Sequence, residues 1–299
     1  MPDLENRKNT NVCIVGNGDW GRRVSNVAKS ISRFSVLPYI NSSTDDNEKH
    51  DLLSKADLVY IATPPEAQKN YIDFCLSANK DVICETPFLC TKTQRESVYK
   101  ELYTRDNSKN IFYVNYPYIS DSLFIGAIKI AAENNFSFFS VKCSGPKYAD
   151  NPMRAKKVYS NQAINIIIQL MAMKTYKFDK IIMHNNDFGE LFYKDSICVF
   201  AWGHSEIPII EINIKGKDFS FERKFTYDEL DQIYPLLVVY LTSVRSMEIT
   251  PTTPRSMSIN TLQHSLSAEH LSDLFVALDG KKYQSTFENL IFSGKFKYE

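Results

Sequence analysis

The chain has 299 residues, which is enough for one or two domains with a substantial hydrophobic core. Its 35 Lys and Arg residues balance 35 Asp and Glu residues, so the formal net charge is zero. This balance argues against a nucleic-acid-binding protein and against a polybasic membrane anchor, because both carry a basic surplus.

The first eleven residues are polar and charged, and no apolar run approaches the ~20 residues that a membrane span needs. We therefore expect a cytoplasmic protein without a secretory signal. The six cysteines form no CxxC pair, which indicates reduced thiols rather than disulfides. The five histidines show no metal-ligand spacing, and no metal site is predicted.

Short apolar strands alternate with amphipathic helices in the first part of the chain. This alternation predicts a parallel α/β sheet that is covered by helices on both faces. The expected strands are residues 11–15, 35–40, 58–62, 81–84 and 110–115, and the expected helices are residues 19–32, 45–55, 66–78 and 91–106.

The pattern changes near residue 120, so we predict two domains, 1–120 and 121–299. Consecutive strand-like runs in the second domain indicate an α+β fold with an open, mainly antiparallel sheet. The expected strands are residues 136–143, 178–184, 192–202, 207–214 and 219–225, and the expected helices are residues 122–134, 159–173, 228–246 and 265–278.

Glycine is scarce, yet three of the ten glycines fall within six residues, at Gly16, Gly18 and Gly21. This G-x-G-x-x-G motif follows a strand and opens a helix. The first glycine permits a tight turn, the second lets backbone N–H groups reach a pyrophosphate, and the third lets helix and strand pack closely. The motif predicts a Rossmann dinucleotide-binding domain, with Asp19 and Trp20 also in the cofactor-binding loop.

The end of the second expected strand is where the ribose of the dinucleotide is usually recognised. The residues there are Asn41-Ser42-Ser43-Thr44, and no acidic residue stands among them to bind the 2′-hydroxyl of NAD. Asp45 follows too late and is expected to cap the next helix. Ser42 and Ser43 are therefore predicted cofactor contacts, with a preference for NADP over NAD.

The order of the motifs resembles that of the glucose–fructose oxidoreductase and inositol dehydrogenase (Gfo/Idh/MocA) family. The resemblance is carried by the segments 16–21, 59–65 and 81–87. It implies an NAD(P)-dependent oxidoreductase that acts on a small metabolite, usually a sugar or polyol, and often a homo-oligomer formed through the second-domain sheet. The cofactor contacts that it implies beyond the glycine loop are Ala62, Thr63, Pro64, Pro65, Glu85 and Thr86.

Three positions depart from the family pattern. Glu-Lys-Pro is replaced by Glu85-Thr86-Pro87, and the histidine of Thr-Pro-Pro-x-x-His is replaced by Gln68. The family's Asp-x-Gly-x-His aligns best with the segment from Asn161 to Asn165. Threonine and asparagine can hold a substrate oxygen, but they cannot exchange protons with it near neutral pH. Thr86, Asn161 and Asn165 are therefore candidate catalytic-site residues without an acid–base group.

Tyr116 and Tyr118 follow the fifth expected strand and are further candidates for a proton donor. Three functions stay open. The chain is an oxidoreductase that transfers a hydride to or from a sugar-like metabolite without the usual lysine. Alternatively, it is a catalytically silent protein that binds a cofactor or metabolite, or it is an imine or biliverdin-type reductase that uses a tyrosine.

Overall fold

A computed structural model gives the fold, and its chain divides into two compact units. The first unit comprises Met1–Asn115 and Ile233–Leu262, and the second comprises Tyr116–Gln232 and Gln263–Glu299. The chain thus returns to the first unit within a stretch that the sequence pattern assigned to the second domain. The residues that the structure describes are 9–104, 110–116, 122–133, 136–146, 152–172, 179–184, 188–193, 195–226, 233, 234, 236–238, 240, 241, 268, 269, 271–273, 276 and 283–285.

The first unit contains a five-stranded parallel sheet in the order β2-β1-β3-β4-β5, which confirms the predicted parallel α/β fold. The second strand is shorter than expected, because Pro38 lacks the N–H group that a continued ladder needs. Only Ile40 pairs again, in an isolated bridge to Val15. The strands are β1 (Thr10–Val15), β2 (Phe34–Val36), β3 (Leu58–Ile61), β4 (Asp81–Glu85) and β5 (Phe112–Asn115).

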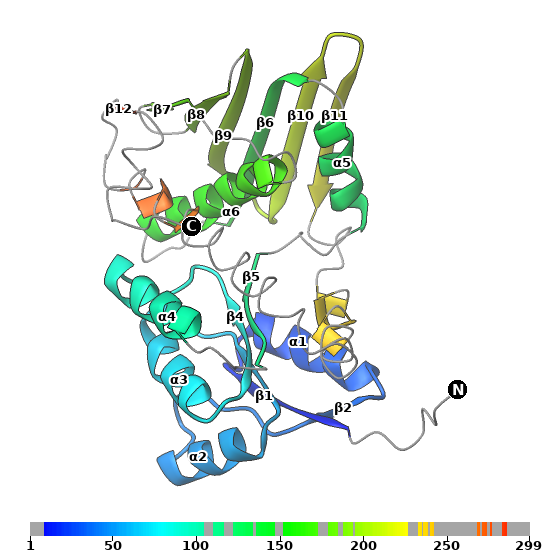
Figure 1. The fold of residues 1–299 in the computed structure, drawn as a ribbon. Coiled ribbons are helices and arrows are strands. Elements are labelled where there is room, and N and C mark those ends of the chain that lie inside the picture. Colours follow the sequence, from blue (N-terminus) through cyan, green and yellow to red (C-terminus); the bar gives the residue numbers. More distant parts are fainter. Residues whose placement is uncertain are drawn as a thin grey trace. The chain divides into compact units, whose positions relative to one another are not determined.

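Helices cover both faces of this sheet, as Figure 1 shows. One face packs against α1 and against helical residues of the returning segment, with Leu237 and Tyr240 in the same hydrophobic core as Ile14 and Tyr60. Alternate strand residues such as Cys13 and the neighbours of Tyr60 point to the other face, on which α2 to α4 lie. The helices are α1 (Asp19–Ser30), α2 (Asp46–Lys55), α3 (Pro65–Ser77) and α4 (Lys92–Thr104).

The second unit contains a seven-stranded sheet in the order β11-β10-β6-β9-β8-β7-β12. The pairs are antiparallel except for β6 and β9, so the sheet is mainly antiparallel, as predicted. Helices α5 (Ser122–Glu133) and α6 (Pro152–Ala172) lie on one face (Figure 1). The strands are β6 (Phe136–Gly145), β7 (Lys180–Met183), β8 (Phe188–Tyr193), β9 (Ser196–His204), β10 (Ile209–Gly216), β11 (Ser220–Thr226) and β12 (Tyr283–Ser285).

Two expected elements of the second unit differ in the structure. The apolar run 192–202, predicted as one strand, contains the tight turn of a hairpin, in which Tyr193 pairs with Ser196. The helix predicted over 159–173 begins earlier, at Pro152, because proline is well tolerated in the first turn of a helix. The first difference arises within a continuous apolar run, and the second lies in a polar stretch that carries no apolar helix periodicity.

The described part of the chain has no helix that is long and apolar enough to cross a membrane. None of the six cysteines, all of which lie in the described ranges, forms a disulfide, and five of them are buried. Burial raises the pKa of the Cys13, Cys75 and Cys198 thiols to about 12, so these groups stay protonated core side chains.

Asp81 connects β4 to the returning segment. Its carboxylate accepts hydrogen bonds from the Ile111 amide and the Tyr240 hydroxyl, both at 2.8 Å. Burial raises the pKa of Asp81 to about 6, although these two donors act in the opposite direction. Tyr240 also stacks on Phe34, with ring centroids 6.3 Å apart.

We expect Asp81 to make stability fall as pH rises from about 4 to about 6, because the folded state binds the proton more tightly than the unfolded chain. The free energy of unfolding should decrease by up to about 3 kcal/mol over this range. In Asp81→Asn this decrease should disappear. Urea unfolding at pH 4 and pH 8 measures it, with Asp51→Asn at the exposed surface as the control. If the free energies of unfolding of Asp81→Asn and the wild-type protein differed by the same amount at both pH values, this account would be contradicted.

Candidate dinucleotide-binding site

The turn that joins β1 to α1 depends on two glycines. Gly16 has a φ of +109°, and a Cβ placed there would lie 2.6 Å from the carbonyl oxygen of Ala62. At Gly21 a Cβ would lie 2.1 Å from the carbonyl oxygen of Gly16. No side chain fits at either position, so α1 starts close to the carboxyl ends of β1 and β3.

Gly18 differs from these two glycines because it is open. It caps α1 in an extended conformation, with φ −64° and ψ −179°, and no side chain among the described residues caps the helix. A Cβ at Gly18 would meet nothing within 4 Å. The start of α1 therefore offers backbone N–H groups and a positive helix dipole beside free space, which suits a pyrophosphate. Asp19, next to it, pairs at the surface with Arg22 at 2.5 Å.

The side chains after β2 are largely engaged with one another. The Asn41 side-chain oxygen accepts hydrogen bonds from the Ser43 amide (2.8 Å) and hydroxyl (2.6 Å). Asp45 caps α2 by accepting from the amides of Asn47 and Glu48, as expected, and Ser42 is exposed. The carboxylate nearest in sequence to the ribose position thus has a structural role.

The segment Ala62–Pro65 follows β3 at the same edge of the sheet. The Ala62 amide donates to the Val15 carbonyl at 2.8 Å, and Pro65 begins α3. The Thr63 hydroxyl oxygen is buried and has no hydrogen-bond partner among the described residues. A buried hydroxyl without a partner is costly, which is consistent with a hydrogen bond to a bound ligand.

Glu85 ends β4 and gathers three donors on one oxygen. Its Oε1 accepts from Trp20 Nε1 at 2.6 Å, from Asn115 Nδ2 at 2.7 Å and from the Tyr60 hydroxyl. The donors come from α1, β5 and β3, so this carboxylate connects the glycine loop to the strand ends. Burial raises the pKa of Glu85 above its usual value, and its hydrogen bonds only partly offset this effect. Thr86, the next residue in the sequence, is half-buried.

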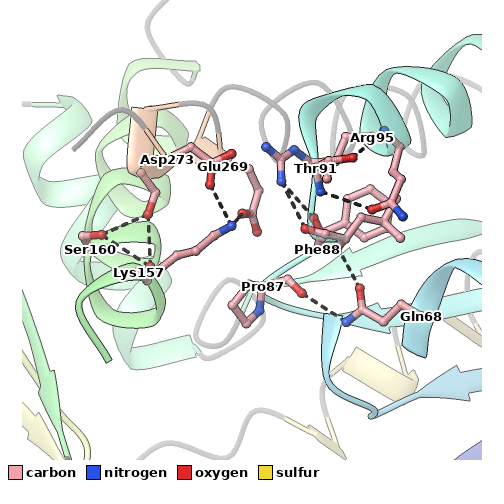
Figure 2. Close-up of polar contacts among 12 residues, drawn as sticks. Gln68, Pro87, Phe88, Thr91, Arg95, Lys157, Ser160, Glu269 and Asp273 are labelled. Atoms are coloured by element: carbon pink, nitrogen blue, oxygen red, sulfur yellow. Dashed lines mark hydrogen bonds and ion pairs between the residues drawn. The ribbon is translucent and has the colours of Figure 1, made fainter. Parts of the chain in front are cut away.

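Gln68 fixes the loop that follows Glu85. From α3 its Nε2 donates to the carbonyls of Glu85 (3.0 Å) and Pro87 (3.1 Å), while its Oε1 accepts from the Leu89 amide at 2.8 Å. Figure 2 shows the Gln68 amide pointing into this loop. The position that lacks the family's histidine therefore holds Thr86 in place through the backbone on either side.

In the second unit, Asn161 and Asn165 lie one turn apart on α6, and each side chain is 1% exposed. Neither amide has a hydrogen-bond partner among the described residues. One turn earlier, Lys157 contacts Asp273 at 2.7 Å and buried Glu269 at 3.9 Å (Figure 2). Two neighbouring buried amides on one helix face, neither with a hydrogen-bond partner in the described ranges, are the clearest sign of a ligand contact in this unit.

Sequence reasoning located some of these groups and missed others. The structure brings the predicted loop, the Thr-Pro-Pro segment and Glu85 to one edge of the first sheet. Tyr116 is buried, and Tyr118 lies outside the described residues. The hydrogen bonds of Tyr60 and Asn115 to Glu85 and the ion pairs of Lys157 were missed. A polar atom near the carboxyl end of an apolar strand was the only available signal for the first two residues.

A parallel sheet with a glycine-rich turn, followed by an open-sheet domain, defines a Rossmann nucleotide-binding protein with a second α+β domain. Residues 22–116 match the model of the Gfo/Idh/MocA oxidoreductase family with an NAD-binding Rossmann fold. The resemblance to that family is thereby confirmed over the Rossmann domain. No curated protein matches the chain.

Solved structures share the fold of nearly the whole chain at low sequence identity. GenD2 from gentamicin A biosynthesis, in complex with NAD, is 12% identical with a TM-score of 0.69, over 93% of this chain and 97% of its own. Myo-inositol 2-dehydrogenase from Lactobacillus plantarum is 12% identical with a TM-score of 0.66, over 94% and 100%. Scyllo-inositol dehydrogenase from Lactobacillus casei, with NAD(H) and scyllo-inositol, is 14% identical with a TM-score of 0.66, over 93% and 99%.

The glycine geometry predicts opposite effects at two positions. Gly18→Ala should change the free energy of unfolding by less than about 0.5 kcal/mol, because the methyl group enters free space. It should weaken dinucleotide binding at least about tenfold, since that space is where the glycine motif predicts the pyrophosphate. Gly21→Ala should destabilise the fold by about 2 kcal/mol or more. Thermal unfolding and NADPH fluorescence titration separate the two effects, and equal destabilisation by both variants would contradict the assignment.

Proposed function

We propose that the protein is an NAD(P)-dependent oxidoreductase that acts on a small hydroxyl- or carbonyl-bearing metabolite, such as a sugar derivative. The observation that carries this proposal is the glycine turn, in which two positions exclude a side chain and the third leaves space at an uncapped helix start. When bound, a nicotinamide dinucleotide supplies or accepts the hydride. The chain's own residues bind it, orient the substrate and exclude water.

The residues present fit such a cofactor. In our proposal Gly16, Gly18 and the first turn of α1 hold the pyrophosphate. The buried Thr63 hydroxyl, which lacks a partner among the described residues, donates or accepts one further hydrogen bond. Glu85 and Thr86 border the nicotinamide half, with Ala62, Pro64 and Pro65 shaping the same edge.

We further propose a preference for NADP(H). Asp45, the first acidic side chain after β2, is engaged in capping α2. Ser42 is exposed, and the Ser43 hydroxyl donates to the Asn41 side chain, so neutral groups stand where NAD-specific sites place a carboxylate.

For the substrate we propose a position against Asn161 and Asn165. Each asparagine offers one acceptor oxygen and two N–H donors, which suits neighbouring hydroxyl or carbonyl groups. Neither group titrates near neutral pH, and neither does Thr86. We therefore expect a substrate that is already electrophilic, with its proton exchanged with water. Buried Tyr116 gives no specific support to a tyrosine-dependent imine or biliverdin-type reductase.

The decisive test combines cofactor binding with turnover. We expect the protein to bind NADPH more tightly than NADH in a fluorescence titration, and to oxidise NADPH with a member of a panel of sugar carbonyls and imines. In Asn165→Leu, a change that preserves side-chain volume, the turnover number over KM should fall at least about tenfold. NADPH affinity should stay unchanged, because the amide contacts substrate only.

The stability of Asn165→Leu is the control. Because the amide has no partner in the described structure, replacing it with leucine should leave the free energy of unfolding unchanged or increased. Loss of stability would show that Asn165 has a structural role. NADPH binding without turnover of any panel member would favour a catalytically silent binding protein, and failure to bind either cofactor would refute the proposal.

We also propose that the second-domain sheet forms a homo-oligomer interface. Phe138, Phe188 and Val199 lie on the face of the sheet opposite α6, where Val199, Phe188 and their neighbours line a hollow of about 580 Å³. These side chains are half-buried and apolar.

We expect the protein to scatter light as a dimer or larger assembly, and Val199→Glu to shift it to a monomer, because a buried charge without a partner opposes association. Arg223→Glu, a charged and exposed position on β11, is the control and should leave the assembly intact. A wild-type monomer at micromolar concentration would contradict the proposal.

A further inference from the structure

The hydrogen-bond donors that contact the Glu85 carboxylate in the described part of the chain are all neutral. Trp20 Nε1 and Asn115 Nδ2 can only donate, so Glu85 Oε1 acts only as an acceptor. The Tyr60 hydroxyl also donates to this oxygen while it accepts from Asn115 Nδ2 at 3.2 Å. Three converging donors are the arrangement that stabilises an ionised carboxylate without cancelling its charge.

No cation neutralises this charge in the part of the chain that the structure describes. None of its ion pairs includes Glu85, and the residue that follows is the neutral Thr86. Arg23 packs over the Trp20 ring, 5.6 Å from its centroid, but it is exposed to solvent. The end of β4 therefore carries a negative charge at the edge of the candidate site.

The strand order shows which half of a dinucleotide this charge would face. β2 lies on one side of β1, while β3 and β4 lie on the other. The adenosine ribose is recognised at the end of the second strand, so the nicotinamide half extends over the ends of β3 and β4. Trp20, in the first turn of α1, connects the pyrophosphate loop directly to Glu85.

We propose that Glu85 makes this site selective for the oxidised form of the cofactor. This inference rests on the proposed cofactor site. The nicotinamide ring carries a positive charge when oxidised and none when reduced, so a neighbouring carboxylate stabilises only the oxidised form. In the family pattern a lysine adjoins this glutamate, and its charge would oppose the effect. Here Thr86 supplies no such charge.

The consequence is a shift in the equilibrium between the bound species. Glu85 shifts the equilibrium on the protein toward oxidised cofactor and reduced substrate, while the overall equilibrium in solution is unchanged. In that step a hydride leaves the reduced cofactor for a carbon of the substrate, and the attached oxygen or nitrogen takes one proton from water.

Calorimetric titration at pH 8 with NADP⁺ and NADPH, and with NAD⁺ and NADH, tests the proposal. The quantity compared is the Kd of the oxidised form divided by the Kd of the reduced form. In Glu85→Gln this ratio should rise about tenfold, because glutamine keeps an acceptor for the three donors but removes the charge. Asp81→Asn removes the carboxylate at the other end of the same strand, about 13 Å away, and should leave the ratio unchanged.

An unchanged ratio in Glu85→Gln, with both cofactor forms still bound, would overturn the inference. Failure of the wild-type protein to bind either form would instead refute the proposed function. If Glu85→Gln does not fold, the wild-type protein decides: it should bind the oxidised form at least as tightly as the reduced form. A tenfold preference for the reduced form would overturn the inference.

Discussion

The close approach of the β1–α1 turn to the end of β3 is the constraint on which the candidate site depends. Gly16 adopts a positive φ directly against the Ala62 carbonyl, and Gly21 packs against Gly16. Because the backbone fills these positions, α1 cannot move away without losing the contact. Its first N–H groups are thereby fixed at the edge where the parallel strands end, and of the three glycines in the turn, Gly18 is the one whose added Cβ would meet no described atom within 4 Å.

Further side-chain contacts fix the ends of β4 and β5 relative to this turn. Trp20 reaches from the first turn of α1 to Glu85, and Tyr60 and Asn115 reach the same oxygen from the strands on either side of β4. Gln68 then holds the backbone after Glu85. One carboxylate and one amide thus fix the loop that carries Thr86, where the family pattern has a lysine. The loop is therefore held in place here although the lysine that it carries in the family pattern is absent.

The sequence predicted the first sheet well because its signals are local: apolar runs, helix periodicity and the spacing of three glycines. The contacts around Glu85 could not be predicted, since they join residues 25 to 65 positions apart through side chains of ordinary composition. The return of residues 233–262 to the first unit was hidden for the same reason. Asn161 and Asn165 were located by their alignment with a motif, but only the structure shows that both amides are buried without partners in its described part.

The chemistry of the two units follows from the cost of burying charge. An ionised carboxylate or imidazolium at Asn161 or Asn165 would need a partner to offset desolvation, whereas an amide retains donors and acceptors at lower cost. However, an amide cannot act as a general acid or base near neutral pH. Glu85 is a buried acidic side chain that this structure does retain, and three neutral donors offset part of the cost of its desolvation. In the first unit, the carboxylate of Glu85 is suited to stabilise a positive charge on the proposed cofactor. In the second unit, the amides of Asn161 and Asn165 are poorly suited to withdraw a proton from an alcohol, which agrees with the proposal that the substrate is already electrophilic.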